Sequence, residues 1–265
     1  MTMPEPSIYD RLHAALDAEE PVALATVVQG PGTGGKLLVG PGLEPLGTLG
    51  DPDLDRVVVR DALGELESSW TGVRHYGPHG EAREDTVWVF IESFAPPPQM
   101  WIFGAVDFTA ALARVAKVLG YRVVVCDARS VFATPQRFPM ADEVVVSWPN
   151  ELIEQRGHEL GRRDAICVLT HDAKFDVPAI VAALPTAVGY LGAMGSRRTH
   201  ADRCDRLRAE GVTEDEISRI MGPIGLDIGA RTPEETAVSI VAEIIARRTG
   251  RDAPSLRDTS GDIHR

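Results

Sequence analysis

After residue 100 the chain alternates short apolar runs with segments that repeat their apolar side chains at helical spacing. The runs are expected to be strands and cover residues 101–103, 122–126, 143–147, 165–170 and 187–191. The segments between them, 107–119, 151–160, 177–184 and 197–210, are expected to be helices. Strand and helix in alternation predict a parallel sheet with right-handed crossovers. Because the strands are almost wholly apolar, helices should cover both faces of this Rossmann-like α/β sheet.

The first 94 residues show a different pattern, typical of a small α+β domain. Helical spacing of apolar side chains predicts helices over 7–18 and 53–69. Strands are expected at 22–28, 36–39 and 87–94, with a glycine-rich turn at 30–35. The stretch 72–83 is polar and is expected to be a loop.

Three consecutive prolines, at positions 96–98, separate the two patterns. Proline cannot continue a helix or a central strand, so residues 95–99 are predicted to be a stiff linker between a domain over 1–94 and a domain over 100–250. A final helix over 233–248 is expected, because Thr232, Pro233 and Glu235 form a strong N-terminal capping sequence. Residues 251–265 are polar and aperiodic, which predicts a flexible tail.

Composition narrows the class of protein. The chain has 265 residues, 44% hydrophobic and 25% charged, as globular proteins do. Its formal net charge of −12 argues against a nucleic-acid partner, which would require a basic surface. No signal-peptide pattern and no apolar run of about 18 residues is found, so we expect a cytoplasmic protein without a membrane span.

The three cysteines show no metal-binding spacing and cannot all pair, which fits a reducing compartment. Cys126 and Cys167 lie in apolar runs and are expected to be buried core residues. Cys204 lies in a polar helix, where an exposed thiol is possible.

The first strand–turn–helix of the second domain lies where a dinucleotide-binding fold carries its glycine fingerprint. Of the expected glycines only Gly104 is present; Val106 and Thr109 replace the others. Asp107 adds a negative charge where a pyrophosphate would bind, and we interpret it first as a helix N-cap. Asp127 stands where an acidic residue would bind a ribose. The pattern therefore predicts a Rossmann fold in which NAD(P) binding is disfavoured.

Polar clusters follow several of the predicted strands, and parallel strands place their carboxyl ends at one edge. We expect these clusters to form one pocket for a phosphorylated ligand. They comprise Asp127 and Arg129; Thr170, His171 and Asp172; and Gly192, Gly195, Ser196, Arg197 and Arg198. The last group favours an anion, because glycines, a hydroxyl N-cap and two arginines precede or begin a helix. The alternative is a capped helix with two solvated arginines.

Two further features carry candidate chemistry. His171 beside Asp172 could form an acid–base pair, but no nucleophile accompanies them, and a structural or ligand-orienting role is the favoured interpretation. The glycine-spaced segment 223–230 contains Gly225 and a lone carboxylate, Asp227. Loops of this kind let backbone approach a ligand or a partner chain.

Several of these motifs occur in the order found in one known family. They are Gln136-Arg137-Phe138-Pro139 with Ala141-Asp142, Thr170-His171-Asp172, Leu191-Gly192-Ala193-Met194-Gly195-Ser196-Arg197-Arg198, Pro223-Ile224-Gly225-Leu226-Asp227-Ile228-Gly229 and Thr232-Pro233-Glu234-Glu235. In these segments, between about residues 100 and 250, the chain resembles the xanthine dehydrogenase accessory factor family (XdhC/CoxI).

The resemblance implies a non-enzymatic factor that binds the molybdenum cofactor (molybdopterin) transiently. It further implies a homodimer that assists sulfuration of the cofactor by a cysteine desulfurase and its insertion into an apo molybdenum hydroxylase. Xanthine dehydrogenase and carbon monoxide dehydrogenase are the typical clients. The cofactor-binding residues would be Gly104, Asp107, Asp127, Arg129, Thr170, His171, Asp172, Gly192, Gly195, Ser196, Arg197, Arg198, Gly225 and Asp227, with no metal ligand and no catalytic residue.

The chain departs from the family pattern in two places. The stretch 47–55 lacks the cysteine usual there, which bears on metal ligation and sulfur relay. The turn after Gly104 lacks the usual glycine and histidine. Two other functions remain open at this point: an NAD(P)-dependent oxidoreductase, and a scaffold that only bridges maturation partners.

Overall fold

A computed structural model describes residues 6–260 of the chain, with the side chains of residues 67 and 68 excepted. The chain forms two compact units that divide between Pro96 and Pro97, inside the proline run. The linker was predicted over 95–99, but it ends at Pro98, because Gln99 is the first residue of a strand of the second unit.

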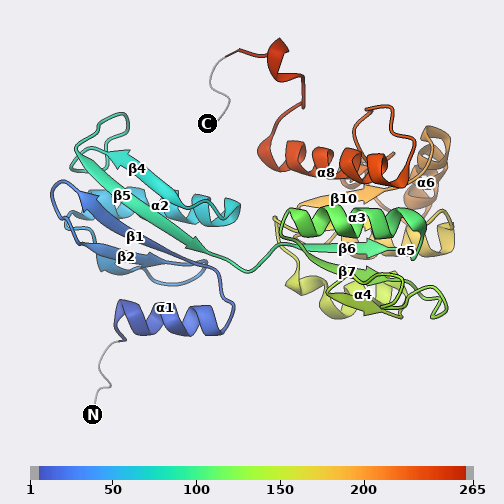
Figure 1. The fold of residues 1–265 in the computed structure, drawn as a ribbon, viewed down its shortest axis with the longest axis horizontal. Helices are drawn as coiled ribbons and strands as arrows, with labels where there is room; N and C mark the ends of the chain where they lie inside the picture. Colours follow the sequence, from blue (N-terminus) through green and yellow to red (C-terminus); the bar gives the residue numbers. More distant parts are fainter. Residues whose placement is uncertain (1–5, 261–265) are drawn as a thin grey trace. The chain divides into compact units, whose positions relative to one another are not determined.

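The first unit is a five-stranded antiparallel sheet with strand order β3-β2-β1-β5-β4 (Figure 1). Helix α2 packs on one face of this sheet, and helix α1 packs on the other. The strands are β1 (Val22–Gln29), β2 (Lys36–Val39), β3 (Leu46–Thr48), β4 (Gly72–Tyr76) and β5 (Val87–Phe94). The helices are α1 (Ile8–Asp17) and α2 (Pro52–Ser68).

The polar loop predicted over 72–83 is wrong for its first five residues, which form β4. This strand lies at the edge of the sheet and buries only Tyr76, so its sequence shows no apolar alternation. The short edge strand β3 was likewise not expected, because glycine and proline surround it.

The second unit contains a six-stranded sheet with strand order β11-β10-β9-β6-β7-β8, and every pairing in it is parallel. The first strand of the unit, β6, lies in the middle, and the chain winds outward from it in both directions (Figure 1). This is the doubly wound Rossmann arrangement. The strands are β6 (Gln99–Phe103), β7 (Arg122–Cys126), β8 (Glu143–Val145), β9 (Ala165–Val168), β10 (Tyr190–Ala193) and β11 (Ile220–Met221).

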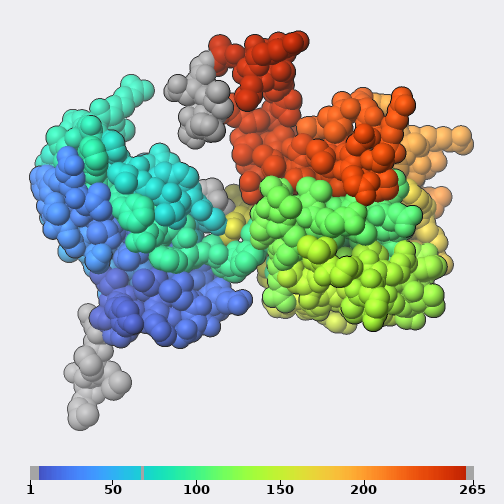
Figure 2. Space-filling view, viewed as in Figure 1, coloured from blue at the N-terminus to red at the C-terminus, as the bar shows by residue number. Residues whose placement is uncertain are grey.

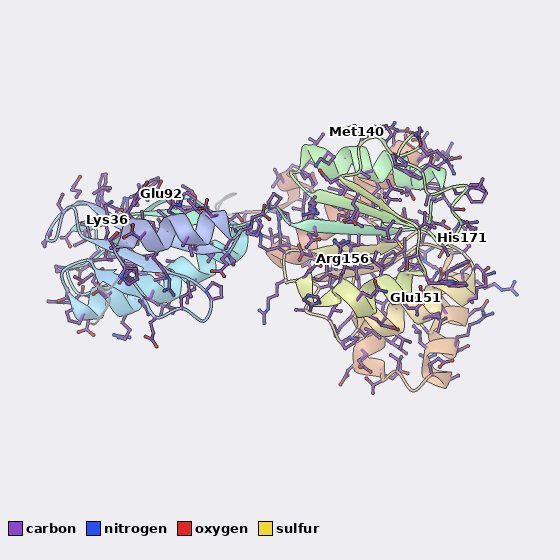
Figure 3. All side chains as sticks on the ribbon, turned by 90° about the horizontal axis from the view of Figure 1, so that it is seen from below. Lys36, Glu92, Met140, Glu151, Arg156 and His171 are labelled. Atoms are coloured by element: carbon purple, nitrogen blue, oxygen red, sulfur yellow. The ribbon has the colours of Figure 1, made fainter. Side chains whose placement is uncertain are left out.

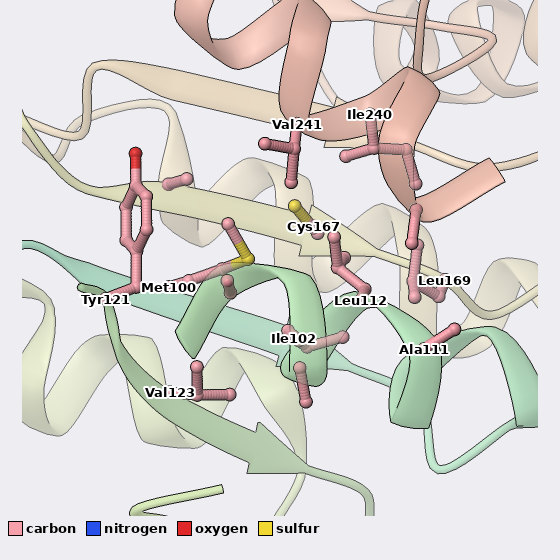
Figure 4. Packing of buried hydrophobic residues seen from close by; sticks show 14 of the residues in the cluster. Met100, Ile102, Ala111, Leu112, Tyr121, Val123, Cys167, Leu169, Ile240 and Val241 are labelled. Atoms are coloured by element: carbon pink, nitrogen blue, oxygen red, sulfur yellow. The ribbon is translucent and has the colours of Figure 1, made fainter. Parts of the chain in front are cut away.

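Successive residues of the central strands enter two separate cores, one on each face of the sheet. On one face Met100 and Ile102 pack with helices α3 and α8, through residues such as Leu112 and Ile240 (Figure 4). The two helices lie side by side in the space-filling view (Figure 2). The other core contains residues of α4, α5, α6 and α7. The helices are α3 (Asp107–Val118), α4 (Pro149–Arg156), α5 (Ala173–Ala183), α6 (Arg197–Ala209), α7 (Glu214–Ser218) and α8 (Pro233–Thr249).

Two elements of the second unit begin three or more residues away from the predicted position, and two others were not predicted. Helix α5 begins four residues earlier than expected, because the Asp172 side chain caps it by accepting a hydrogen bond from the Lys174 N–H. Strand β10 begins at Tyr190 rather than at 187, so Gly192 lies inside the strand. Helix α7 and the two-residue strand β11 were not predicted, because both are too short to show a period.

Residues 251–260 are exposed and contain one short 3₁₀ turn, Leu256–Asp258. The flexible tail stays a prediction, and residues 261–265, which belong to it, lie outside the described part of the chain. Among residues 6–260, no helix is long and apolar enough to cross a membrane.

Candidate cofactor-binding site

All the predicted site residues except Gly192 belong to segments at the carboxyl-terminal edge of the parallel sheet, or to the loop and helices beside it. Gly104 follows β6, Asp127 follows β7, and Thr170 follows β9 closely. His171 is seen at this end of the strands in Figure 3. The residues nevertheless do not form the single pocket that we expected. They occupy three neighbouring places, described in turn below.

The first place is the turn between β6 and α3, where a Rossmann fold usually binds a pyrophosphate. Here the Asp127 carboxylate, from the end of the neighbouring strand β7, accepts a hydrogen bond from the Ala105 N–H of this turn at 2.7 Å. The Arg129 side chain donates to both carboxylate oxygens, at 2.9 and 2.7 Å. An internal carboxylate therefore takes the backbone donor that a phosphate would use.

The Asp127 side chain is 3% exposed, which raises its pKa, but the hydrogen bonds from Arg129 and the Ala105 N–H outweigh burial and lower the pKa overall. The carboxylate is therefore ionised at neutral pH and repels a second anion. Its hydrogen bonds to Arg129 also occupy the oxygens that would bind a ribose. The geometry opposes dinucleotide binding at this turn.

The prediction that Asp107 caps helix α3 is wrong. Val106 occupies the N-cap position and makes no side-chain hydrogen bond, whereas Asp107 is the first helical residue and its side chain is 91% exposed. Gly104 has a structural role, because its φ is +110° and an added Cβ would lie 2.6 Å from Thr170 Cγ2. Close packing between β6 and β9 therefore requires glycine here.

The second place, which we call the α5–α6 pocket, is a cavity of about 350 Å³ between the starts of these two helices. His171 and Asp172 line it, as the sequence suggested. Thr170, which precedes them in the chain, is buried and does not line the cavity. The remaining lining residues were not predicted and are Ala173, Asp176, Val177, Thr199, Asp202, Arg203 and Arg206.

A buried ion pair forms part of the wall of the α5–α6 pocket. Arg203 Nη2 donates to Asp176 Oδ2 at 3.0 Å and to the Met194 carbonyl at 2.7 Å, and the Thr170 hydroxyl donates to the other oxygen of Asp176. Burial raises the pKa of Asp176 despite the hydrogen bonds from Thr170 and Arg203. The network links the ends of β9 and β10 to helices α5 and α6. In the sequence, this network appears only as one charged residue on the apolar face of each helix, Asp176 in α5 and Arg203 in α6. That pattern can be recognised only once the buried faces of the helices are known.

The third place, which we call the α6–loop pocket, is an open cavity of about 640 Å³. It is lined by residues 195–198, by the loop 223–230, and by Thr236 and Ser239 of α8. Ser196 caps α6 by accepting a hydrogen bond from the Thr199 N–H at 3.0 Å. Arg197 and Arg198 begin the helix, where backbone N–H groups have no partner within the helix. The hydroxyl cap, the helix start and the two arginines lie together here, and anion binding at this place stays a prediction.

The loop 223–230 is held against helix α8 by hydrogen bonds. Glu243 accepts from the Gly225 N–H at 2.9 Å and from the Tyr190 hydroxyl at 2.5 Å. Ser239 donates to the Leu226 carbonyl at 2.5 Å. Asp227 is exposed and lies 3.9 Å from the Arg197 guanidinium. The loop therefore forms a fixed wall, positioned by Tyr190, Ser239 and Glu243, none of which any local sequence pattern indicated.

Gly192 lies in β10 and does not line either pocket. An added Cβ would lie 2.5 Å from Ile224 Cδ1, so glycine lets the chain after β11 pack on the strand.

All three cysteines are buried, so the exposed thiol considered at Cys204 is not found. Burial raises the pKa of the Cys126 thiol to about 12 and also raises that of Cys167. Within residues 6–260, no group of three or more His, Cys, Asp or Glu residues is arranged to hold a metal ion.

Comparison with known proteins identifies both units. A family model described as the XdhC Rossmann domain matches residues 100–244, and one described as the XdhC and CoxI family matches residues 15–77. The chain is 34% identical over 165 residues to a protein of Bacillus subtilis named as a probable subunit of xanthine dehydrogenase, covering 62% of this chain and 47% of that protein. It is 34% identical over 91 residues to the molybdenum cofactor insertion chaperone PaoD of Escherichia coli, covering 34% of this chain and 29% of that protein.

The chain thus spans less than half the length of these curated relatives. A crystal structure described as a xanthine dehydrogenase from Bacillus halodurans shares the fold, with a TM-score of 0.55 and 19% identity, over 95% of this chain and 98% of that one. Since the Rossmann-domain match alone covers more than half of the sequence, the chain belongs to the XdhC and CoxI family.

Proposed function

We propose that this chain is an accessory factor for a molybdenum hydroxylase, and that it binds the molybdenum cofactor and hands it to the apo-enzyme. The observation that carries the proposal is the α6–loop pocket. A capped helix start, two arginines and a fixed loop face one cavity of about 640 Å³. These groups fit the phosphate that ends the cofactor's pterin side chain.

The relatives support the same assignment. One is named as a molybdenum cofactor insertion chaperone and another as a probable subunit of xanthine dehydrogenase. A hydroxylase of the xanthine dehydrogenase or carbon monoxide dehydrogenase type is therefore the proposed client. The homodimer and the cytoplasmic location suggested by the sequence stay predictions.

The burial of the thiols favours a role in binding over a role in sulfur transfer by this chain. Its three thiols are buried, and burial raises the pKa of Cys126 and Cys167, which disfavours the reactive thiolate. If the cofactor is sulfurated while bound, the persulfide must come from a partner such as a cysteine desulfurase. In this account the chain holds and presents the cofactor.

The proposal is tested by the pterin that the protein carries from the cell. The full chain is purified from cells that make molybdenum cofactor and from cells that lack its synthesis, and bound pterin is released by acid, oxidised and measured by fluorescence. We expect pterin only with protein from the first cells. Equal signals from the two preparations would overturn the proposal.

A further inference from the structure

The α5–α6 pocket contains both kinds of hydrogen-bonding charge. Three carboxylates, those of Asp172, Asp176 and Asp202, line it with the guanidinium groups of Arg203 and Arg206. A site for phosphate alone would not carry three carboxylates, since like charges repel. The pocket is therefore suited to a ligand that offers donors on one edge and acceptors on another.

Two of these groups are free to bind a ligand. Asp202 and Arg206 are exposed and stand four residues apart on α6, a spacing at which such pairs commonly form an ion pair. Among the described residues, neither side chain has a hydrogen bond or an ion pair with another residue. Asp172 and Asp176, by contrast, are engaged by the cap of α5 and by Arg203.

A third group lacks a partner although it is buried. The Arg203 side chain is 3% exposed, and its Nη2 bonds to Asp176 and Met194, but within the described residues its Nη1 has no hydrogen-bond partner. Buried donors are nearly always satisfied, so the inner wall of the pocket, which Arg203 helps to form, lacks one hydrogen-bond acceptor.

The pocket also has an apolar wall and lies next to the α6–loop pocket, the proposed phosphate site. Ala173 and Val177 supply apolar lining, against which a flat ring can pack. The first turn of α6 separates this pocket from the α6–loop pocket: Ser196 lines one, Thr199 lines the other, and their hydroxyl oxygens are 2.9 Å apart. One ligand crossing this turn would place a ring in one pocket and a phosphate in the other.

We propose that the α5–α6 pocket binds the 2-amino-4-oxopyrimidine ring of a pterin. The molybdenum cofactor contains this ring, so the inference rests on the proposed function. The ring's amino group and adjacent N–H form a pair of donors that match the Asp202 carboxylate. Its carbonyl oxygen and ring nitrogens are acceptors for the exposed Arg206 guanidinium. Guanine shares this edge, and its binding is an outcome of the test.

The test uses the purified full chain and three probes: pterin, lumazine and guanosine. Lumazine replaces the 2-amino group of pterin by an oxygen, so it lacks one donor. Binding is measured by isothermal titration calorimetry or by quenching of ring fluorescence. We expect saturable binding of pterin, and binding of lumazine weaker by about tenfold or more, as loss of a hydrogen bond to a charged group implies. Guanosine should bind more weakly than pterin.

Variants on the exposed face of α6 sharpen the test. Asp202→Asn should weaken pterin binding by about tenfold. Asp205→Asn is the matched control, because Asp205 lies on the same helix, pairs with Arg208 at 2.7 Å and does not line the pocket. Equal affinity for pterin and lumazine, tighter binding of guanosine, or an unchanged affinity in Asp202→Asn would each overturn the assignment.

The outcome is separable from that of the proposed function. If the chain carries cofactor from the cell while Asp202→Asn leaves pterin affinity unchanged, the accessory role stands and the ring subsite is refuted. If pterin binds as described but the chain carries no cofactor from producing cells, the subsite stands and the accessory role fails.

Discussion

Arg203 donates a hydrogen bond to Asp176 at 3.0 Å, and the two side chains are 3% and 4% exposed. The pair joins α6 to α5, and through the Met194 carbonyl and the Thr170 hydroxyl it also holds the ends of β10 and β9. The segments that follow β9 and β10, one leading to each candidate pocket, are therefore held by one ion pair. Breaking it should affect stability and ligand binding together.

Arg203→Ala should lower the free energy of unfolding by about 3–5 kcal/mol, because it leaves Asp176 buried without its partner. The double variant Asp176→Leu/Arg203→Met should lose less stability than Arg203→Ala, since neither charge remains. Urea unfolding followed by circular dichroism measures both values. A loss below about 1 kcal/mol for Arg203→Ala would contradict the structural role of the pair.

Asp127 predicts a specific pH dependence of stability. Its pKa is lower in the folded chain than the usual 3.8, so its contribution is fully present above that value and is lost as the pH falls through the folded pKa. Below about pH 4, the unfolding free energy of the wild type should therefore fall more steeply with acid than that of Asp127→Asn. Denaturant unfolding between pH 3 and 7 measures the slopes. Parallel slopes would contradict the assignment, and Asp107→Asn serves as the exposed control.

The same carboxylate predicts that the chain does not bind nicotinamide dinucleotides well. Titration with NADH and NADPH should show no saturable binding at micromolar concentrations, because the Ala105 N–H is already bonded and Asp127 repels a pyrophosphate. Fluorescence of the reduced nicotinamide provides the readout. A micromolar dissociation constant for either dinucleotide would restore the oxidoreductase hypothesis.

Gly225 predicts a local effect on the α6–loop pocket. Its φ is +99°, and an added Cβ would lie 2.5 Å from Ser239 Oγ, so Gly225→Ala should cost about 1–3 kcal/mol of stability and weaken cofactor binding. Gly229→Ala is the control, because its φ of +72° is also positive but its added Cβ meets no atom within 4 Å. Thermal unfolding separates the two variants. Equal losses would show that crowding at Ser239 is unimportant.

Much of the second unit follows from the sequence, because strands buried on both faces are apolar along their whole length. The runs at β6, β7 and β9 are of this kind, and the capping sequence at Thr232 marks α8. The edge strand β4 shows no such signal, since it buries only Tyr76. Segments at edges and in short connections are defined by tertiary pairing rather than by their own pattern.

In the candidate site, too, local features could be predicted from the sequence and long-range contacts could not. Ser196 and Arg197 could be placed from the sequence, because a helix start with a hydroxyl cap is a local feature. Arg203 and Glu243 could not, because their roles depend on partners 27 and 18 residues away in the chain. The hydrogen bond from the Ala105 N–H to Asp127 is also a long-range contact. Because of it, the carboxylate that was predicted to bind a ribose instead binds the chain's own backbone.

The central claim is that the phosphate of the molybdenum cofactor binds at the start of α6. The most direct measurement is equilibrium binding of freshly released cofactor to the wild type and to Arg197→Glu/Arg198→Glu, with Arg257→Glu in the exposed tail as control. We predict saturable binding to the wild type and the control, and a loss of at least about tenfold in affinity for the double variant, together with failure to activate an apo-hydroxylase. Unchanged affinity in the double variant would contradict the account.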